Sequence, residues 1–300
     1  MQKDTILYGI IVIIILWTFI EQKLIMITKH TVNSDKLSKE GSAIDFILLA
    51  DLHNRTFGKN NHRLIKKIDK LSPKFIIMAG DMINKKDISY PSNAFTLIEQ
   101  LAKKYTIYYA FGNHENRLER IGRETSSEWT LADKDYHSTW VEFKRRLAEQ
   151  KVVFLDNQKI TVNYVGITLT ITGVTLGHDY FVFNSTKELS SKHLNHLLGE
   201  SSAESYQLLI AHNPVYFQAY SEWGADLTLS GHLHGGMMRL PGIGGVISPQ
   251  AKFFPKYDTG KHEHNKHYLI VSRGLGSHSI MPRLFNIPEI ICVKLQNGNP

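Results

Sequence analysis

Five apolar segments of this chain are each followed by residues of the types that bind metal ions. The segments cover residues 46–50, 75–79, 107–111, 208–211 and 226–229. The polar residues that follow them are, in chain order, Asp51 and His53; Asp81; Asn113; His212; and His232 and His234. One histidine at a strand end is more often a packed structural residue than a ligand. Five polar strand ends together predict a shared site, because α/β sheets place their sites at the carboxyl ends of strands.

The residue types indicate a centre of two divalent cations. Two cations about 3.5 to 4 Å apart need an anionic bridging ligand, and Asp81 is the predicted bridge. Neutral imidazoles and an amide oxygen fill the other positions without cancelling the charge that polarises a phosphoryl oxygen and acidifies bound water. Cys292 is the only cysteine, which excludes thiolate clusters and an intrachain disulfide. Nitrogen and oxygen ligands suit transition metals, with Mn²⁺ expected first and Fe or Zn²⁺ as alternatives.

Alternating apolar and amphipathic segments must position these residues. The first three apolar segments alternate with helical patterns at residues 62–71, 94–104 and 139–150, which is the rhythm of βαβ units. After Val152 the apolar segments lie closer together, and further strands are expected at residues 159–163, 166–172, 268–272 and 289–295. The sequence therefore predicts an α/β fold whose second half is richer in strands.

The N-terminus carries a candidate membrane anchor. Residues 5–20 are apolar and uncharged, and with residues 24–27 they approach the roughly 20 residues that span a bilayer. No small-residue cleavage site follows, which favours a single-pass anchor at residues 1–27 in the cell membrane; a buried first helix is the alternative. Lysines after the span favour a cytoplasmic domain. Residues 28–43 are polar and predict a tether, which leaves residues 44–297 as the globular domain.

The chain resembles the calcineurin-like metallophosphoesterases. The resemblance rests on Asp51-x-His53, Gly80-Asp81-x-x-Asn84, Gly112-Asn113-His114-Glu115, Ala211-His212 and Gly231-His232-x-His234. Gly235-Gly236, Leu240-Pro241, residues 271–276 and Pro288-Glu289-Ile290 resemble the membrane-anchored bacterial, phosphodiesterase-like subgroup. The resemblance implies a four-layer αββα sandwich of two mixed β-sheets flanked by helices.

The resemblance also implies roles for individual residues. One metal would be held by Asp51, His53, Asp81 and His234, and the other by Asp81, Asn113, His212 and His232. His114 would stand outside the metals as the catalytic acid or as the electrostatic partner of the phosphate. Asn84 departs from the acidic residue of many relatives, but this position is not a ligand.

The predicted activity is hydrolysis of a P–O bond, as a phosphodiesterase or pyrophosphatase, by hydroxide formed at two metals. The anchor and the apolar loop at residues 237–254 favour a lipid-linked substrate at the bilayer, such as a UDP-diacylglucosamine-like pyrophosphate. Soluble nucleotides and a non-catalytic, metal-binding membrane scaffold are the alternatives. The net charge of +7 agrees with a phosphate-bearing substrate or an anionic membrane. The basic residues are scattered, so no specific nucleic acid is expected.

Several other residues invite a functional interpretation. Arg273 and Arg283 are candidates for substrate binding, because a guanidinium group suits bidentate phosphate contacts; surface charge is the alternative. Glu115 and Asp179 are candidates to orient His114 or the substrate. The histidines at residues 262–267 are expected to lie in a solvated polar loop rather than in an accessory metal site.

Overall fold

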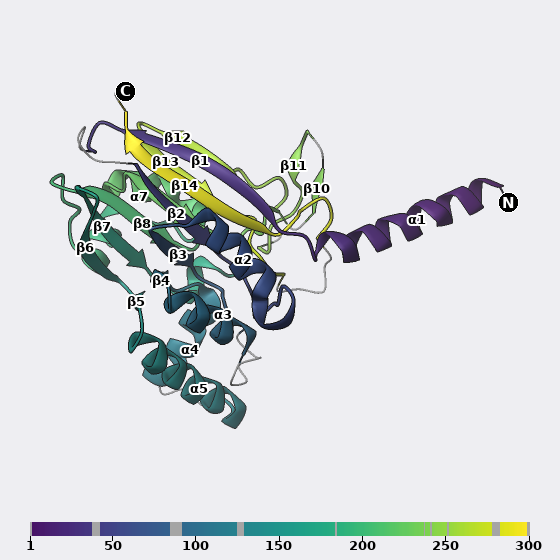
Figure 1. Ribbon diagram of the computed structural model, residues 1–300, viewed down its shortest axis with the longest axis horizontal. Coiled ribbons are helices and arrows are strands. Elements are labelled where there is room, and N and C mark those ends of the chain that lie inside the picture. Colours follow the sequence, from purple (N-terminus) through teal and green to yellow (C-terminus); the bar gives the residue numbers. More distant parts are fainter. Residues whose placement is uncertain are drawn as a thin grey trace.

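The computed structural model describes residues 2–37, 43–84, 92–124, 129–183, 185–236, 238–240, 242–250, 252–277 and 283–298. Its centre is a pair of six-stranded mixed sheets (Figure 1). The first has the strand order β1 (Met26–Ser34), β14 (Glu289–Asn297), β2 (Ile44–Leu49), β3 (Phe75–Ala79), β4 (Thr106–Ala110) and β5 (Val152–Leu155). The second has the order β12 (Gly260–His264), β13 (His267–Val271), β9 (Leu227–Ser230), β8 (Tyr206–Ala211), β7 (Ile167–Val174) and β6 (Gln158–Tyr164). β10 (Arg239–Leu240) and β11 (Gly244–Gly245) form a separate short hairpin.

The two large sheets share one apolar core. Phe46 of β2 and Phe75 of β3 stack with their ring centroids 4.8 Å apart, and β8 adds the buried Leu208 and Ile210. Strands β2 to β5 are parallel to one another, as are β7, β8, β9 and β13. Parallel strands covered on both faces need near-continuous apolar sequences, which these have. The carboxyl ends of the parallel strands of each sheet therefore share one edge.

Helices cover the outer faces of both sheets. α2 (His62–Leu71), α3 (Asn93–Ala102) and α5 (Leu131–Ala148) pack on the first sheet and lie along one side of it in Figure 1. α6 (Ser191–Leu198) and α7 (Phe217–Trp223) pack on the second. The predicted mixed α/β fold of two mixed sheets with flanking helices is confirmed. Every strand expected from the sequence is found, with its ends within two residues of the expected positions.

Two helices differ from the expectation: α4 (Asn113–Arg123) was not expected, and α5 begins earlier than the sequence pattern indicates. α4 follows β4 after two residues. α5 begins at Leu131 instead of residue 139, because Thr130 and Asp133 form a reciprocal cap. The Thr130 hydroxyl accepts from the Asp133 N–H at 3.1 Å, and the Asp133 carboxylate accepts from the Thr130 N–H at 3.0 Å. The first turns of α5 are largely exposed, so they lack the apolar periodicity that marks its second half.

The expected tether at residues 28–43 is in large part a strand. β1 pairs in parallel with β14 over nine residues, from Met26 with Glu289 to Ser34 with Asn297. The prediction was wrong for this stretch because β1 is an edge strand, in which Val32 alone is buried, so its composition is polar like that of a linker. Residues 38–42 of the expected tether lie outside the described residues.

Helix α1 (Gln2–Glu21) projects away from the two sheets (Figure 1). It is long and apolar enough to cross a membrane, with a mean hydropathy of 2.0 between Asp4 and Glu21, and only 11% of that stretch is buried. A core helix would be buried, so the alternative of a buried first helix does not hold. Signal sequences share this length and composition, so these two features alone do not distinguish a retained anchor from a signal sequence.

Candidate metal centre

Tight turns at the strand ends bring the metal-binding residue types together. Asp51, Asp81 and His232 follow β2, β3 and β9, and all three have a positive φ. His53 and His234 also have a positive φ. This backbone conformation is uncommon outside glycine and has a strain of about 1–3 kcal/mol per residue where the surroundings hold it. Strain concentrated at five residues of one cluster is typical of a functional site.

Two glycines let these turns pack directly against carboxylates. A Cβ on Gly112 would collide with Oδ1 of Asp81, and a Cβ on Gly231 would collide with Oδ2 of Asp51. Any other residue would push the β4 and β9 turns away from the neighbouring strands. The glycine before Asn113 and the glycine before His232 therefore set the spacing of the cluster.

The buried carboxylate of Glu115 holds two of these turns. It accepts hydrogen bonds from the backbone N–H groups of Asp81 and Met82, both at 2.8 Å, and from that of Gly112 at 3.0 Å. The Tyr109 hydroxyl also donates to it at 2.7 Å. Glu115 thus joins the ends of β3 and β4 beneath the cluster. The hydrogen bonds described for Glu115 go to backbone N–H groups and to Tyr109, which gives it a structural function.

The polar side chains converge in two overlapping sets. On one side, Nε2 of His53 lies 3.2 Å from Nε2 of His234, which is 3.7 Å from Oδ1 of Asp51. On the other side, Nε2 of His212 lies 3.3 Å from Oδ2 of Asp81 and 3.8 Å from Oδ1 of Asp51. Asp81 faces both sets, since its Oδ2 is also 3.9 Å from Nε2 of His53.

Three buried groups of donor atoms are close enough together to hold a metal ion, counted over the described ranges. They are Asp51, His53 and His234; His53, Asp81 and His114; and Asp81, His212 and His232. The structure therefore brings all the predicted histidine and aspartate ligands into one cluster. Asn113 joins them from the first residue of α4.

Backbone carbonyls fix the ring nitrogens that point into the cluster. Nδ1 of His212 lies 2.6 Å from the carbonyl oxygen of Ala79, and Nδ1 of His234 lies 3.3 Å from that of Gly276. A carbonyl can only accept, so Nδ1 carries a proton and Nε2 is the nitrogen that faces the carboxylates. This arrangement is the usual outer support of a metal-binding imidazole.

The donor set fits a cation. The Asn113 side-chain oxygen is buried and has no hydrogen-bond partner. A buried acceptor in this condition normally costs about 1–3 kcal/mol, which a metal ion would offset. Nε2 of His53 and Nε2 of His234 lie 3.2 Å apart, a separation at which both nitrogens can bind one ion.

Burial and charge shift the protonation of these groups in opposite directions. Burial raises the pKa of Asp51 to about 7, although nearby His212 opposes the shift. Burial disfavours the charged form of His212, but the charge of Asp81 and a hydrogen bond to it outweigh this and raise the pKa of His212 to about 9. Burial opposes the charge of Asp81 as well, yet His114 and His212 hold its pKa well below the ordinary value. Asp81 is therefore the permanent anion of the cluster.

His114 lies at the edge of the cluster. Its backbone N–H donates to Oδ1 of Asp81 at 2.9 Å, and its Nε2 is 3.9 Å from Oδ2 of the same carboxylate. Its ring meets that of His53 edge-on, with centroids 4.8 Å apart. Geometry alone would allow it to act as a ligand or as an outer catalytic group.

Arg283 does not lie where a phosphate-binding residue would. It is 1% exposed, and its guanidinium donates to the carbonyl oxygens of Asn286, Gly276 and Arg273 at 2.7 to 2.8 Å. These bonds occupy both edges of the guanidinium group, so Arg283 braces the segment beneath the cluster. Arg273 lies beside Gly235, the residue after His234, since a Cβ on that glycine would be 3.1 Å from the Cγ of Arg273.

Other candidates from the sequence lie elsewhere. The Asp179 carboxylate pairs with Nζ of Lys187 at 3.2 Å on the surface. His262 and His264 lie on β12, and His267 begins β13; none belongs to a described group of converging donors, as expected of a solvated hairpin. Of the expected apolar loop, Met237, Pro241 and Ala251 lie outside the described residues.

Phe181 covers one side of the cluster and could not be found from the sequence. Its ring centroid is 5.2 Å from that of His232 and 6.0 Å from that of His212. It follows a one-turn helix, His178–Tyr180, in the connection after β7. A lone aromatic residue in an irregular connection has no pattern by which sequence reasoning could find it.

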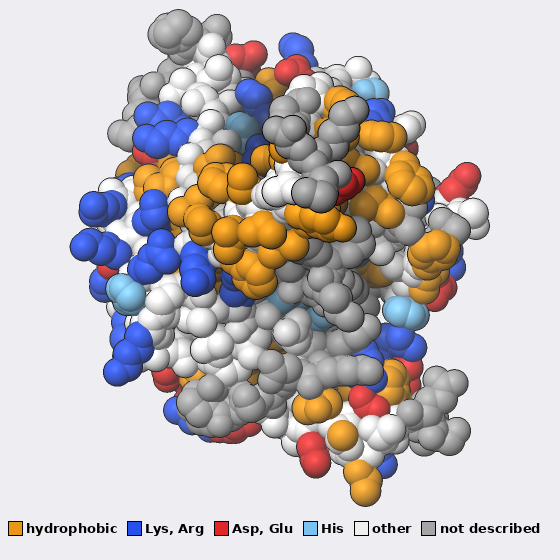
Figure 2. Space-filling model, turned by 90° about the vertical axis from the view of Figure 1, so that its right-hand side faces the viewer, with side chains coloured by type: hydrophobic (Ala, Val, Ile, Leu, Met, Phe, Trp, Pro, Cys, Tyr) orange, Lys and Arg blue, Asp and Glu red, His pale blue; other side chains and the backbone are white. Residues whose placement is uncertain are grey.

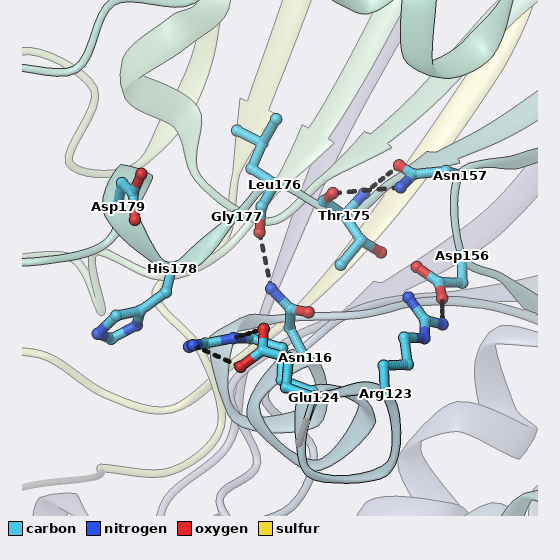
Figure 3. A pocket seen from close by; sticks show the side chains of 11 residues that line it. Asn116, Arg123, Glu124, Asp156, Asn157, Thr175, Leu176, Gly177, His178 and Asp179 are labelled. Atoms are coloured by element: carbon cyan, nitrogen blue, oxygen red, sulfur yellow. Dashed lines mark hydrogen bonds and ion pairs between the residues drawn. The ribbon is translucent and has the colours of Figure 1, made fainter. Parts of the chain in front are cut away.

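A polar pocket of about 380 Å³ lies along α4 (Figure 3). Asn116, one turn along α4 from Asn113, lines it and donates to the Leu176 carbonyl at 2.8 Å. Arg123 paired with Asp156, and the 177–179 segment, form other walls. The pocket offers hydrogen-bonding and charged groups to whatever part of a substrate extends past α4.

Comparison with known proteins identifies the family. Residues 44–236 match the family model of the calcineurin-like phosphoesterases. The chain is 23% identical to the uncharacterized metallophosphoesterase YkuE of Bacillus subtilis (strain 168), over 94% of this chain and 89% of YkuE. It is 32% identical to the phosphodiesterase YaeI of Escherichia coli (strain K12), over 32% of this chain and 34% of YaeI. The chain therefore belongs to the calcineurin-like phosphoesterase family, whose members bind divalent metals, and is a metal-dependent hydrolase of phosphoric esters.

Proposed function

We propose that the cluster is a dinuclear centre bridged by Asp81. The supporting observation is the position of Oδ2 of Asp81, 3.3 Å from His212 on one side and 3.9 Å from His53 on the other. Asp51, His53 and His234 would complete one site, and Asn113, His212 and His232 the other. Mn²⁺ is the preferred ion for this nitrogen and oxygen set, with Fe or Zn²⁺ as alternatives.

The metals, when bound, would polarise the phosphoryl oxygens and supply hydroxide for attack on phosphorus. The chain's own residues then have separate tasks. Asp81 holds the two sites together, and Glu115 fixes the backbone of Asp81. His114 faces the substrate from the edge of the cluster, where it donates a proton to the departing oxygen or stabilises the charge on the phosphoryl group.

A metal titration combined with hydrolysis assays tests this proposal. The full chain in detergent is loaded with Mn²⁺ and assayed against a diester, a pyrophosphate and a monoester. The proposal expects two ions per chain and hydrolysis of at least one ester class that stops when the ions are removed by a chelator. One ion per chain at saturation with full activity would contradict the dinuclear centre.

For the substrate, we propose a lipid-linked phosphodiester or pyrophosphate at the membrane, such as a UDP-diacylglucosamine-like pyrophosphate. The exposed apolar α1 supports this, because it would hold the centre beside the bilayer. The lysines that follow α1 support a cytoplasmic side for the domain. Family membership leaves no reason to prefer the non-catalytic scaffold.

A soluble nucleotide is the second candidate, and the polar pocket beside α4 favours it. Arginines, carboxylates and amides line this pocket, which suits a sugar or base rather than an acyl chain. The two candidates differ in where the substrate is found. If the enzyme hydrolyses a diacyl pyrophosphate in vesicles faster than the matching water-soluble pyrophosphate, the lipid-linked proposal holds. The opposite order would favour nucleotides.

A further inference from the structure

A second pocket lies at the base of α1. It measures about 440 Å³ and is lined by Arg239, Leu240, Gly242, Ile243, Gly244, Arg273 and Phe285. This volume is within the range of small-molecule sites. We call it the α1-base pocket. None of its described lining residues belongs to the converging metal-binding groups, so it is separate from the site described above.

The pocket is tied to the end of α1. The Glu21 carboxylate, at the last residue of the helix, accepts the backbone N–H of Phe285 at 2.8 Å and that of Asn286. The Arg239 N–H in turn donates to the carbonyl of Leu284 at 3.0 Å. A bilayer that contains α1 would therefore begin next to the mouth of the pocket.

The charge inside the pocket is incompletely neutralised. Nε of Arg273 is buried without a hydrogen-bond partner, and the nearest carboxylate oxygen, on Glu289, is 4.0 Å away. That carboxylate is already engaged by the Arg273 N–H and the Thr28 hydroxyl. Arg239 is paired with Asp258 at 2.8 Å, which fixes it in the wall. Arg273 is thus a partly desolvated cation that an anion would stabilise.

Apolar side chains surround this charge. Leu240, Ile243 and Phe285 are 40%, 64% and 47% exposed, and Phe253 and Phe254 on the same loop are 69% and 59% exposed. Figure 2 looks onto the side from which α1 projects; the hydrophobic side chains at its centre include those of α1 itself, with Lys and Arg beside them. Exposed apolar residues around a partly buried cation suit the boundary between lipid headgroups and acyl chains.

We propose that the α1-base pocket binds the phosphodiester headgroup of an anionic phospholipid of the phosphatidylglycerol type. Arg273 contacts the phosphate, and Ile243 and Phe285 contact the first carbons of the acyl chains. The bound lipid would fix the metal cluster at one orientation to the bilayer. This inference rests on the membrane location proposed above and is independent of the hydrolytic reaction.

Lipid retention by the full chain tests the inference. The delipidated protein in detergent is mixed with equal amounts of phosphatidylglycerol and phosphatidylcholine, and bound lipids are counted by native mass spectrometry. Wild type is expected to retain one phosphatidylglycerol in preference to phosphatidylcholine. Arg273→Gln should reduce that preference about tenfold, since charged hydrogen bonds to phosphate are lost. Ile243→Ser should weaken retention of both lipids without unfolding the protein, because the residue is exposed.

Lys256→Gln is the matched control, because Lys256 is an exposed cation outside the pocket. It should retain lipid as wild type does. An equal loss in Lys256→Gln and Arg273→Gln would overturn the pocket in favour of diffuse charge attraction. Displacement of the lipid by the same concentration of inorganic phosphate would also overturn it, since the site would then be a simple anion site.

Hydrolysis of a water-soluble ester by wild type separates this inference from the proposed function. Activity without any preference for phosphatidylglycerol would refute the lipid site alone. Lipid preference without metal-dependent activity would refute the proposed function alone. Metal content and melting temperature of each variant show whether it has folded.

Discussion

The backbone N–H of Asp81 donates a 2.8 Å hydrogen bond to Oε2 of Glu115, a carboxylate with no exposure to solvent. The same carboxylate accepts the N–H groups of Met82 and Gly112. The Glu115 carboxylate, beneath the candidate metal cluster, thus fixes the backbone turn that carries the Asp81 side chain. Burial, and after it the charge of Asp81, raises the pKa of Glu115. The hydrogen bonds from Tyr109 and from the backbone N–H groups oppose this shift, because they stabilise the charged form of the carboxylate.

Glu115→Gln should weaken metal binding without touching a ligand. An amide offers one acceptor atom where the carboxylate offers two, and its NH₂ group would face N–H donors. We expect a loss of about 1–3 kcal/mol in unfolding free energy, and at least a severalfold loss of metal affinity. Chemical denaturation and competition with a chelator measure the two. Glu222→Gln, on the exposed face of α7, is the control and should change neither.

Metal affinity should rise with pH. In the metal-free protein His212, with a pKa of about 9, is protonated at pH 7, and Asp51, with a pKa of about 7, is half protonated. Both must lose their protons to bind a metal. Affinity should increase about tenfold per pH unit between pH 7 and 9, as His212 loses its proton, and more steeply below pH 7, where Asp51 is protonated as well. Isothermal titration in buffers of different ionisation enthalpy counts the released protons; affinity independent of pH would contradict these shifts.

Removal of α1 should separate location from chemistry. A chain without residues 1–20 keeps Glu21, which holds Phe285 and Asn286, and keeps all of β1. We expect it to hydrolyse a water-soluble ester at the wild-type rate and to remain in the supernatant after centrifugation of membranes. A cut after residue 28 should be less stable, because it removes three residues of β1 from the sheet. Sedimentation of the shorter chain with membranes would mean that α1 is not the main attachment.

His114→Ala should lower kcat by about 10² to 10⁴ while metal content stays the same. If His114 protonates the leaving group, nitrophenyl esters should lose less than alkyl esters, because nitrophenolate departs without a proton. Equal losses would favour stabilisation of the phosphoryl charge. The melting temperature of His114→Ala shows whether the substitution has disturbed α4. Loss of metal from His114→Ala would make this histidine a ligand and refute its outer function.

The parts of the fold that follow from local pattern could be predicted. Strands such as Phe75–Ala79 are buried on both faces, so their apolar runs mark them, and a polar residue after each run marks the site. Glu115 could be named but not assigned, because its partners at Asp81 and Gly112 come together only through the pairing of β3 with β4. The edge strand β1 could not be predicted, because its partner β14 lies at the other end of the chain.

Arg283 shows the opposite error. A guanidinium group suits contacts with phosphate, so the sequence predicts that Arg283 binds the substrate. In the structure, all three guanidinium nitrogens donate to backbone carbonyl oxygens, those of Asn286, Gly276 and Arg273. The sequence shows that an arginine is present, but not which carbonyl groups accept its hydrogen bonds. Phe181 had no pattern at all, since its position over His232 depends on an irregular connection.

The central claim is that Asp81 bridges two metals, and Asp81→Asn tests it most directly. The amide keeps the shape of the side chain but removes the negative charge of a carboxylate that lies 3.3 Å from His212 and 3.9 Å from His53. Elemental analysis of the Mn²⁺-loaded chain should give two ions for wild type, fewer than one for Asp81→Asn, and about one for Asn113→Ala, which removes a ligand of a single site. Two ions and full hydrolytic activity in Asp81→Asn would contradict the bridge.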